Sequence, residues 1–314
     1  MNFLYYLYFA LPSFDLMGIP GKVINRLLSL AMKRVFDSLV PSFFNRTMHK
    51  QGLGINTENR EETIIVSLTS FPARINDIWI TIETILRQSF KPDKIILWLA
   101  NEQFPDKVLP ARLNQLINRG LTIEYCTDLR SHKKYYYSLK NFPESKIITL
   151  DDDLYYHKDV LKNLMVLHKQ FPGQIVTNRA HKITFNGKNI NPYRKWKHNV
   201  TDTIPSHLLV ATGGAGTLYT KGALSQDVFN EKLFKKLCFH ADDLWLKVMA
   251  LKNHTMIVTN KCYNKDYISV GLTQKQKLVT TNVINGGNDE QLKNLLEHFK
   301  IDLNEIRKSD IVTD

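Results

Sequence analysis

Three consecutive aspartates at the end of an apolar segment are the feature that most limits what this chain can fold into. Residues 146–150 (KIITL) are typical of a buried strand, and Asp151, Asp152 and Asp153 follow them directly. Adjacent carboxylates repel one another, and their pKa values rise unless positive charge lies nearby. The fold must therefore bring a cation to the end of this strand.

The segment before the aspartates alternates between strand and helix patterns. Strands are predicted at 63–67, 94–99 and 121–125, and helices at 75–88 and 109–118. Repeated β-α-β units predict an α/β fold, with a mostly parallel sheet flanked by helices. Ligands of such sheets bind beyond the carboxyl ends of the strands, which is where the three aspartates lie.

The alternation becomes looser after Asp153. The sequence predicts a helix at 159–170 and short strands near 174–177, 181–185 and 208–211. Further helices are predicted at 231–236, 242–253 and 288–300. We expect two parts, with an N-terminal helical segment and linker at 1–60 and an α/β domain at 61–314.

The N-terminal part contains an amphipathic basic helix at 21–40. Apolar residues lie near helical spacing in this segment, while Lys22, Arg26, Lys33 and Arg34 lie mostly off that stripe. The stripe comprises Val23, Ile24, Leu27, Leu28, Ala31, Val35, Leu39 and Val40. Such a helix either lies in the surface of an anionic membrane or docks on the protein's own core or on a second subunit. The sequence leaves both explanations open.

Charge and composition exclude little else. The formal net charge of +12 and the pI of about 9.4 indicate attraction to polyanions of some kind. The three cysteines have no disulfide or zinc pattern, and no apolar stretch reaches the length of a membrane span. The apolar start lacks a basic n-region and contains Pro12 and Asp15, so we expect no secretory signal and a cytoplasmic location.

The aspartate triplet suits a divalent metal ion. Mn²⁺ and Mg²⁺ accept carboxylate oxygens and keep open positions for phosphate oxygens. Asp151 and Asp153 can point to the same side of an extended segment, and they are the predicted metal ligands. The alternative is a solvated acidic turn that caps the following helix.

Three segments carry a resemblance to a known family. IIVSLTSFPARI (64–75), ETILRQSFKPDKIILWL (83–99) and IITLDDD (147–153) resemble the nucleotide-binding half of glycosyltransferases with the GT-A (Rossmann-like) fold. The chain is most similar to family 2-like bacterial enzymes of capsule and lipopolysaccharide synthesis, with a weaker likeness to exostosin-type transferases. The resemblance implies that 61–155 binds the nucleotide and 156–314 binds the acceptor.

The same resemblance implies a set of donor-binding residues. The first strand and its loop would hold the nucleoside, the aspartates the metal and diphosphate, and a glycine loop would lie beneath the donor sugar. In this sequence those positions are Ser67, Thr69, Ser70, Arg74, Lys133, Lys134, Asp152, Gly213 and Gly214. The family commonly has a base-binding aspartate after the second strand, where this chain has Glu102, so Glu102 or Asp128 is the candidate for that role. For Lys133 and Lys134 an exposed basic turn is an equal alternative.

An acidic pair, Asp242 and Asp243, opens a predicted helix. Carboxylates in the first turn are favoured by the helix dipole, which explains the pair without any chemistry. The resemblance instead implies that Asp243 faces the acceptor hydroxyl as general base, with Asp242 in a supporting role. Proton removal by a positioned carboxylate is a step that an inverting sugar transfer needs.

Together these observations predict a metal-dependent glycosyltransferase in surface polysaccharide synthesis. It would take a nucleotide-diphosphate sugar as donor and a glycan or lipid-linked oligosaccharide as acceptor, on Mn²⁺ or Mg²⁺. We expect no nucleic-acid partner and a possible peripheral place on the inner face of the cytoplasmic membrane. The alternatives are a haloacid-dehalogenase-like phosphatase, which also has an Asp-x-Asp after a strand, and a basic nucleic-acid-binding protein.

Overall fold

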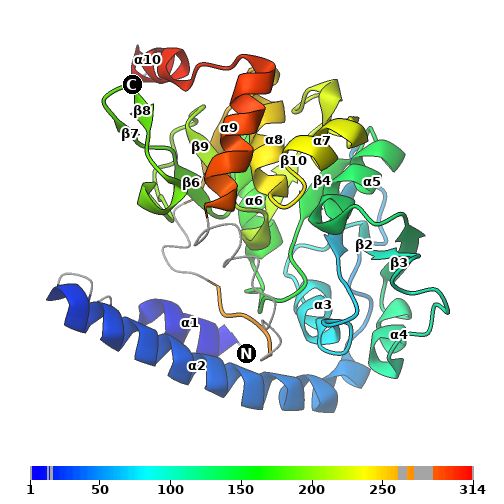
Figure 1. Cartoon of the computed structure of the whole chain (residues 1–314). Helices are drawn as coiled ribbons and strands as arrows, with labels where there is room; N and C mark the ends of the chain where they lie inside the picture. Colours follow the sequence, from blue (N-terminus) through cyan, green and yellow to red (C-terminus); the bar gives the residue numbers. More distant parts are fainter. Residues whose placement is uncertain (1, 13, 15–16, 261–266, 272–285, 313–314) are drawn as a thin grey trace.

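A seven-stranded sheet forms the centre of the molecule (Figure 1). The computed structural model describes residues 2–12, 14, 17–260, 267–271 and 286–312. In spatial order the strands are β11 (Ile257–Thr259), β5 (Ile175–Thr177), β10 (Thr217–Tyr219), β4 (Lys146–Thr149), β1 (Ile64–Thr69), β2 (Lys94–Ala100) and β3 (Leu121–Cys126). All pairings in this sheet are parallel except those of β10 with β4 and β5.

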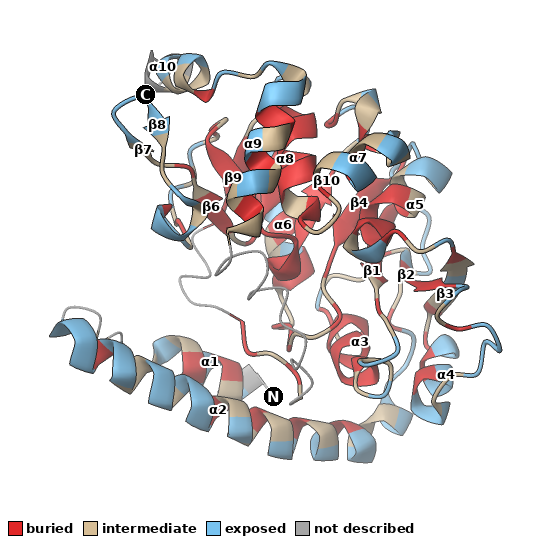
Figure 2. Ribbon diagram, viewed as in Figure 1, coloured by how far each residue is buried: buried red, intermediate tan, exposed pale blue. Residues whose placement is uncertain are grey.

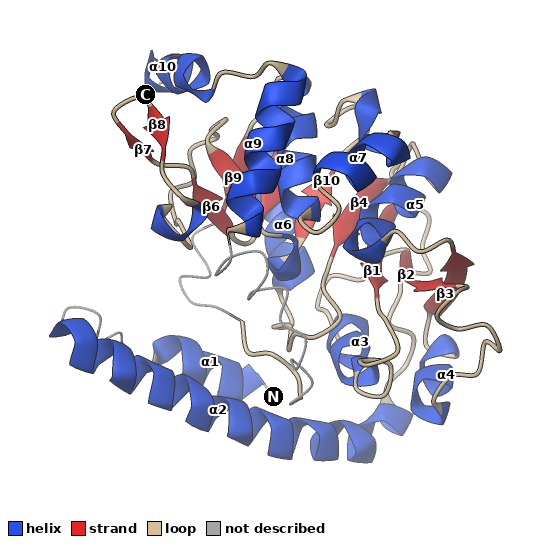
Figure 3. Cartoon of the chain, in the orientation of Figure 1, coloured by secondary structure: helices blue, strands red, loops and turns tan. Residues whose placement is uncertain are grey.

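Helices cover both faces of this sheet (Figure 3). Val66 and Leu68 of β1 join the core that contains α3 (Ile78–Leu86), α4 (Ala111–Ile117) and α6 (Val160–Gln170). Ile65, one residue along, points to the other face and packs near α5 (Lys133–Asn141). Further along the chain lie α7 (Glu231–Leu237), α8 (Asp242–Lys252), α9 (Gly287–Phe299) and α10 (Leu303–Val312). The predicted α/β fold with a mostly parallel, helix-flanked sheet is confirmed.

The second half contains elements that the sequence pattern did not predict. β6 (Ala180–Lys182) and β9 (Leu209–Ala211) match the strands predicted near 181–185 and 208–211, whereas the hairpin of β7 (Phe185–Asn186) and β8 (Asn189–Ile190) was not predicted. β6 pairs with β9 and β7 pairs with β8, both outside the central sheet. β10 and β11 have three residues each, too few for a periodic pattern to be recognised. α5 was not predicted because its three adjacent tyrosines are weaker helix formers than leucine or lysine, although the helix is buried against β1.

Two helices at the N-terminus confirm the predicted helical extension. α1 (Asn2–Ala10) lies beside α2 (Gly18–Thr47), which is longer than predicted and continues through Pro41. Apart from Gly21, the buried residues of α2 are Met32, Phe36, Val40 and Phe44, which recur every fourth residue. Among the described residues, no helix combines the length and the hydropathy that a membrane span requires. The division of the chain at residues 60 and 155 stays a prediction.

The apolar stripe of this helix is not the side that docks on the rest of the chain, which leaves most of the stripe open to solvent. Of its eight residues only Val40 is buried, and the others are exposed or half-buried (Figure 2). The large aromatic residues decided which side docks, because Phe36 meets Tyr5 and Tyr155 at ring distances of 5.1 and 5.2 Å. Aromatic side chains bury large areas and gain further from edge-to-face ring contacts, which favours docking through Phe36.

We predict that Phe36→Ala lowers the free energy of unfolding by about 3–5 kcal/mol, because it leaves a cavity beside the rings of Tyr5 and Tyr155. Leu39→Ala is the control on the same helix, since Leu39 is exposed, and we expect a change within about 0.5 kcal/mol. Urea denaturation followed by circular dichroism measures both. Equal effects of the two substitutions would contradict the docking of α2 through Phe36.

Candidate active site

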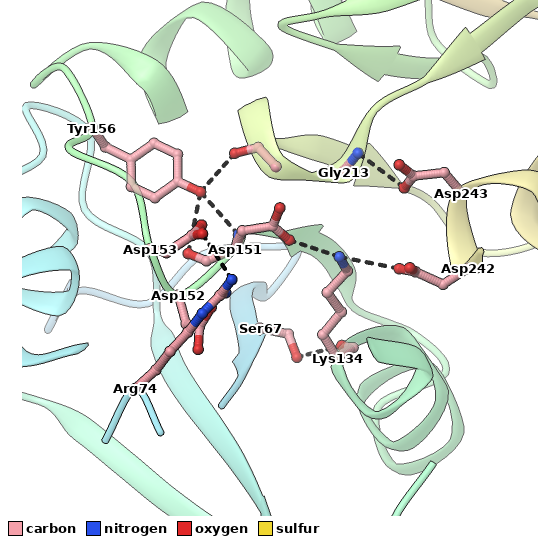
Figure 4. Close-up of polar contacts among 11 residues, drawn as sticks. Ser67, Arg74, Lys134, Asp151, Asp152, Asp153, Tyr156, Gly213, Asp242 and Asp243 are labelled. Carbon is pink, nitrogen blue, oxygen red and sulfur yellow. Dashed lines mark hydrogen bonds and ion pairs between the residues drawn. The ribbon is translucent and has the colours of Figure 1, made fainter. Parts of the chain in front are cut away.

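The carboxyl edge of the central sheet gathers side chains from distant parts of the sequence (Figure 4). The aspartate triplet follows β4 directly, and Ser70 follows β1, the parallel neighbour of β4. β10 runs in the opposite direction, and its first residue, Thr217, pairs with Thr149 of β4 and Thr177 of β5. The glycine loop that leads into β10 therefore lies at the same edge as the aspartates.

Two residues of the loop after β1 hold the middle and last aspartates. The Ser70 hydroxyl donates to Asp152 Oδ2 at 2.5 Å, and Arg74 donates to Asp152 Oδ1. The other terminal nitrogen of Arg74 lies 3.0 Å from Asp153 Oδ2. Burial alone would lower the pKa of Arg74, but Asp152 and Asp153 outweigh it and raise that pKa, so the guanidinium stays charged.

Lys134 joins the triplet to the acidic pair. Its ammonium lies 2.8 Å from Asp151 Oδ1 and 3.0 Å from Asp242 Oδ2. Burial opposes the charge on this lysine, but Asp151 and Asp242 raise its pKa well above the ordinary value. Burial would likewise raise the pKa of Asp242, yet the Lys134 ammonium outweighs it and lowers that pKa. The predicted metal site and the predicted acceptor site thus share one ion-pair network.

The second member of the acidic pair has a different environment. Asp243 Oδ1 accepts a hydrogen bond of 3.0 Å from the Gly213 backbone N–H. Burial, followed by repulsion from Asp242, raises the pKa of Asp243 to about 7, with Lys134 opposing the shift. A carboxylate with this pKa accepts and releases a proton near neutral pH, as a general base must.

Close approach of the glycine loop explains why two of its residues have no side chain. A Cβ atom on Gly214 would lie 2.5 Å from Asp151 Oδ2, and one on Gly213 would lie 3.0 Å from Asp243 Oδ1. The Tyr156 hydroxyl donates to the Gly214 carbonyl at 2.6 Å and accepts from the Asp151 N–H at 2.9 Å. Tyr156 therefore fixes the loop against the triplet.

Other predicted donor-binding residues have different contacts. Ser67 is fully buried, and its hydroxyl donates to the Lys134 carbonyl at 2.5 Å, which fixes the start of α5. Thr69 donates to the Trp98 carbonyl at 2.8 Å. Lys133 and Asp128 form an ion pair of 2.5 Å with each other, beyond the end of β3. Glu102 Oε2 accepts from the Asp128 N–H at 3.2 Å, so the two base-binding candidates lie together.

Two alternatives from the sequence are wrong. The triplet does not cap a helix, because α6 begins at Val160 and its N-cap is Asp159. Lys133 and Lys134 do not form an exposed turn, because both are buried and open α5.

Arg179 is a site residue that the sequence analysis missed. It follows β5, and its guanidinium lies 3.5 Å from the position a Cβ of Gly214 would occupy. Its Nε donates to Thr212 at 2.7 Å, which orients the side chain along the glycine loop. Ligand-binding groups often follow the ends of strands, and Arg179 lies two residues after β5, so this rule would have identified it.

Comparisons with known proteins give no family assignment. No family model matches the chain, and no curated protein sequence matches it. Solved structures do match in shape. A mannosyltransferase from Pyrobaculum calidifontis, in complex with GDP-Man and Mn²⁺, has a TM-score of 0.47 at 11% identity over 87% of this chain and 75% of its own. A Francisella tularensis 2-C-methyl-D-erythritol 4-phosphate cytidylyltransferase has a TM-score of 0.41 at 12% identity over 70% and 99%. With TM-scores below 0.5, these likenesses carry no argument about activity.

The opposite pKa shifts of the acidic pair predict opposite effects on stability. The folded-state pKa of Asp243 lies above its unfolded value of about 3.9, so its protonated form stabilises the fold below about pH 4 and that stabilisation is lost as the pH rises through 7. We therefore predict that Asp243→Asn raises the free energy of unfolding at pH 8 by up to about 4 kcal/mol, with little effect at pH 4.

Asp242→Asn is the matched comparison, because the pKa of Asp242 is lowered by Lys134. Its ionised form stabilises the fold at neutral pH, and this stabilisation is lost as the pH falls through its lowered pKa. We expect Asp242→Asn to destabilise by about 1.5–3 kcal/mol at pH 8. Urea denaturation at the two pH values tests both variants, and a loss of stability in Asp243→Asn at pH 8 would contradict the assignment.

Proposed function

We propose that the chain is a metal-dependent glycosyltransferase that uses a nucleotide-diphosphate sugar. The observation that carries the proposal is the shared network at the carboxyl edge, in which Lys134 contacts both Asp151 and Asp242. Those aspartates are 91 positions apart in the sequence (242 minus 151), yet one ammonium group joins them. A transferase needs such an arrangement, because the leaving group and the attacking hydroxyl must meet at one carbon atom.

The donor diphosphate fits the cationic side chains around the triplet. Arg74, Lys134 and Arg179 all approach the aspartates, and a bidentate guanidinium suits phosphate oxygens. In this proposal the nucleobase of the donor binds at the ends of β2 and β3, where Glu102 and Asp128 lie together. Ser67 and Thr69 support the donor site indirectly, because their hydroxyls donate to the backbone carbonyls of Lys134 in α5 and Trp98 in β2.

The residues present fit a divalent metal ion. Among the described residues no three His, Cys, Asp or Glu side chains lie together as a complete ligand set. Mg²⁺ commonly binds through only one or two carboxylates together with substrate phosphates and water. Asp151, whose side chain is 37% exposed, and Asp153 are the residues that would hold it. When bound, the metal would supply positive charge to the leaving diphosphate.

The protein groups then account for the transfer of the proton. In the proposed reaction the acceptor oxygen bonds to the anomeric carbon, the bond from that carbon to the diphosphate breaks, and the hydroxyl proton passes to Asp243. The elevated pKa of Asp243 suits this role, and the Gly213 N–H holds its carboxylate in place. Asp242 keeps the Lys134 ammonium close to the diphosphate. Direct displacement inverts the anomeric configuration, which NMR of the product checks.

Some parts of the proposal rest on the sequence resemblance alone. These are the glycan or lipid-linked acceptor, the role in capsule or lipopolysaccharide synthesis and the cytoplasmic location. The phosphatase alternative requires a nucleophile on the first strand of the domain, whereas the triplet follows the fourth strand in chain order. Nucleic-acid binding would account for the net charge of +12 but not for the buried acidic network.

We predict that binding of a nucleotide sugar requires divalent metal and is lost in Asp151→Ala and in Asp153→Ala. Each substitution removes a proposed ligand of the metal. A thermal-shift screen of UDP-, GDP-, CMP- and dTDP-sugars with and without Mn²⁺ identifies the donor, and calorimetry then measures its binding to each variant. Asp302→Ala is the control, because Asp302 is exposed in the loop between α9 and α10. Full binding to either triplet variant in the presence of EDTA would refute the metal assignment.

We predict that Asp243→Asn lowers turnover by about 10²-fold or more while donor binding is retained. Asparagine keeps the size of the side chain and its acceptor oxygen for the Gly213 N–H, but it cannot take up a proton. We expect an inflection near 7 in the pH profile of kcat for the native protein, and this inflection should be absent in Asp243→Asn. Asp242→Asn should lower turnover less and move the inflection to lower pH without abolishing it, because repulsion from Asp242 helps to raise the pKa of Asp243. Near-normal turnover of Asp243→Asn would exclude it as the base, and loss of donor binding would reassign it to the metal site.

A further inference from the structure

The outward side of α2 exposes a row of large apolar residues. Ile19, Val23, Leu27 and Leu30 are 80, 52, 60 and 49% exposed. Their spacing of four, four and three residues places them on one side of the helix. On a helical projection, this side lies opposite Met32, the first of the large buried side chains of α2. α2 lies along one boundary of the molecule, and its outer surface is mostly exposed (Figure 2). We call these four residues, together with Lys22, Arg26 and Arg34, the docking face.

The docking face is cationic as well as apolar. Lys22, Arg26 and Arg34 are exposed on it. The only acidic residue of α2, Asp37, is engaged on the inner side, where it contacts Lys33 at 2.8 Å and accepts from the Tyr155 hydroxyl at 2.8 Å. The outward surface therefore combines apolar side chains with positive charge and has no carboxylate of α2 to balance it.

This combination selects one kind of partner. In a symmetric pairing of two α2 helices, each copy would bring the same cationic surface to the interface, and like charges in a desolvated interface repel. An anionic bilayer offers apolar chains and negative headgroups in adjacent layers. We propose that the docking face binds the surface of an anionic membrane, with α2 lying in the plane of the headgroups.

Docking through α2 would also fix the height of the aspartate site above the lipid. Lys33 donates to the carbonyls of Ser269 and Gly271 at 2.6 and 2.7 Å. In turn the Val270 N–H donates to the Asp153 carbonyl at 2.7 Å. The helix is thus connected to the triplet through a few hydrogen bonds. Membrane binding itself does not depend on the proposed function, whereas this positioning toward a lipid-linked acceptor does.

Vesicle flotation tests the proposal with the full chain. We expect the protein to float with vesicles of phosphatidylcholine and phosphatidylglycerol but not with phosphatidylcholine alone, and added salt should weaken the binding. Arg26→Glu and Arg34→Glu should each weaken it about fivefold or more, because each basic residue near an anionic surface contributes about that factor. Val23→Glu with Leu27→Glu should reduce it by at least about tenfold.

Val166→Glu with Ile117→Glu is the matched control. These residues are 50 and 46% exposed on α6 and α4, so the control adds the same charge at similar exposure elsewhere. It should bind vesicles like the native protein, and circular dichroism should show all variants folded. Absence of native binding, or an equal loss in the control, would overturn the proposal. So would a dimer that dissociates in Val23→Glu with Leu27→Glu, because the face would then be a self-interface. Donor binding in solution, measured separately, keeps this result distinct from the proposed activity.

Discussion

The ammonium group of Lys134 is the contact on which the rest of the site depends. It is almost completely buried, and it lies between a carboxylate from the end of β4 and one from the start of α8. Without it, the buried carboxylate of Asp242 would face the partly exposed carboxylate of Asp151 with no cation between them, and uncompensated buried charge costs several kcal/mol. Its position is fixed from behind, because the Lys134 carbonyl accepts a hydrogen bond from Ser67 in the centre of the sheet. The sheet therefore determines where the two acidic segments can meet.

The reversed direction of β10 makes this meeting possible. If β10 ran parallel to its neighbours, the loop before it would lie at the opposite edge, and the Gly213 N–H would not reach Asp243. Because it runs antiparallel, the loop returns to the ligand-binding edge and contacts both acidic groups. The loop approaches so closely that a side chain at Gly214 would collide with Asp151. Topology and residue type are thus linked at this position.

The first half of the fold could be predicted from the sequence because its strands are long and apolar. β1, β2 and β4 each end in residues that the strand-end rule identifies, and Asp151 was found in this way. β10 and β11 could not be predicted, since three residues show no period. The hydrophobic pattern of α2 also did not identify which side of this helix docks on the rest of the chain. Tertiary contacts of Phe36 and Phe44 decided it, whereas the aliphatic stripe was the more regular signal.

The site residues show the same division. The sequence identified the acidic residues by their adjacency, but it identified their positive partners less well. Charge repulsion within the triplet required a cation, and the structure supplies Arg74 and Lys134 from segments far away in the chain. The family resemblance implied that Ser67 binds the donor, but its buried hydroxyl donates a hydrogen bond to the Lys134 carbonyl of α5 instead. The sequence alone does not distinguish a strand side chain that packs against a covering helix from one that lines a binding site.

The balance of charge bears on which ligand this site accepts. Five carboxylates lie in the network, those of the triplet and of the acidic pair, against the three cations Arg74, Lys134 and Arg179. Even with Asp243 protonated, as its raised pKa favours below 7, negative charge exceeds positive charge. A bare diphosphate would add two more negative charges to this excess, whereas a diphosphate neutralised by a divalent ion would add none. Because attraction between unlike charges is strong in a partly buried site, the same electrostatics that hold Lys134 in place support the metal complex as the ligand.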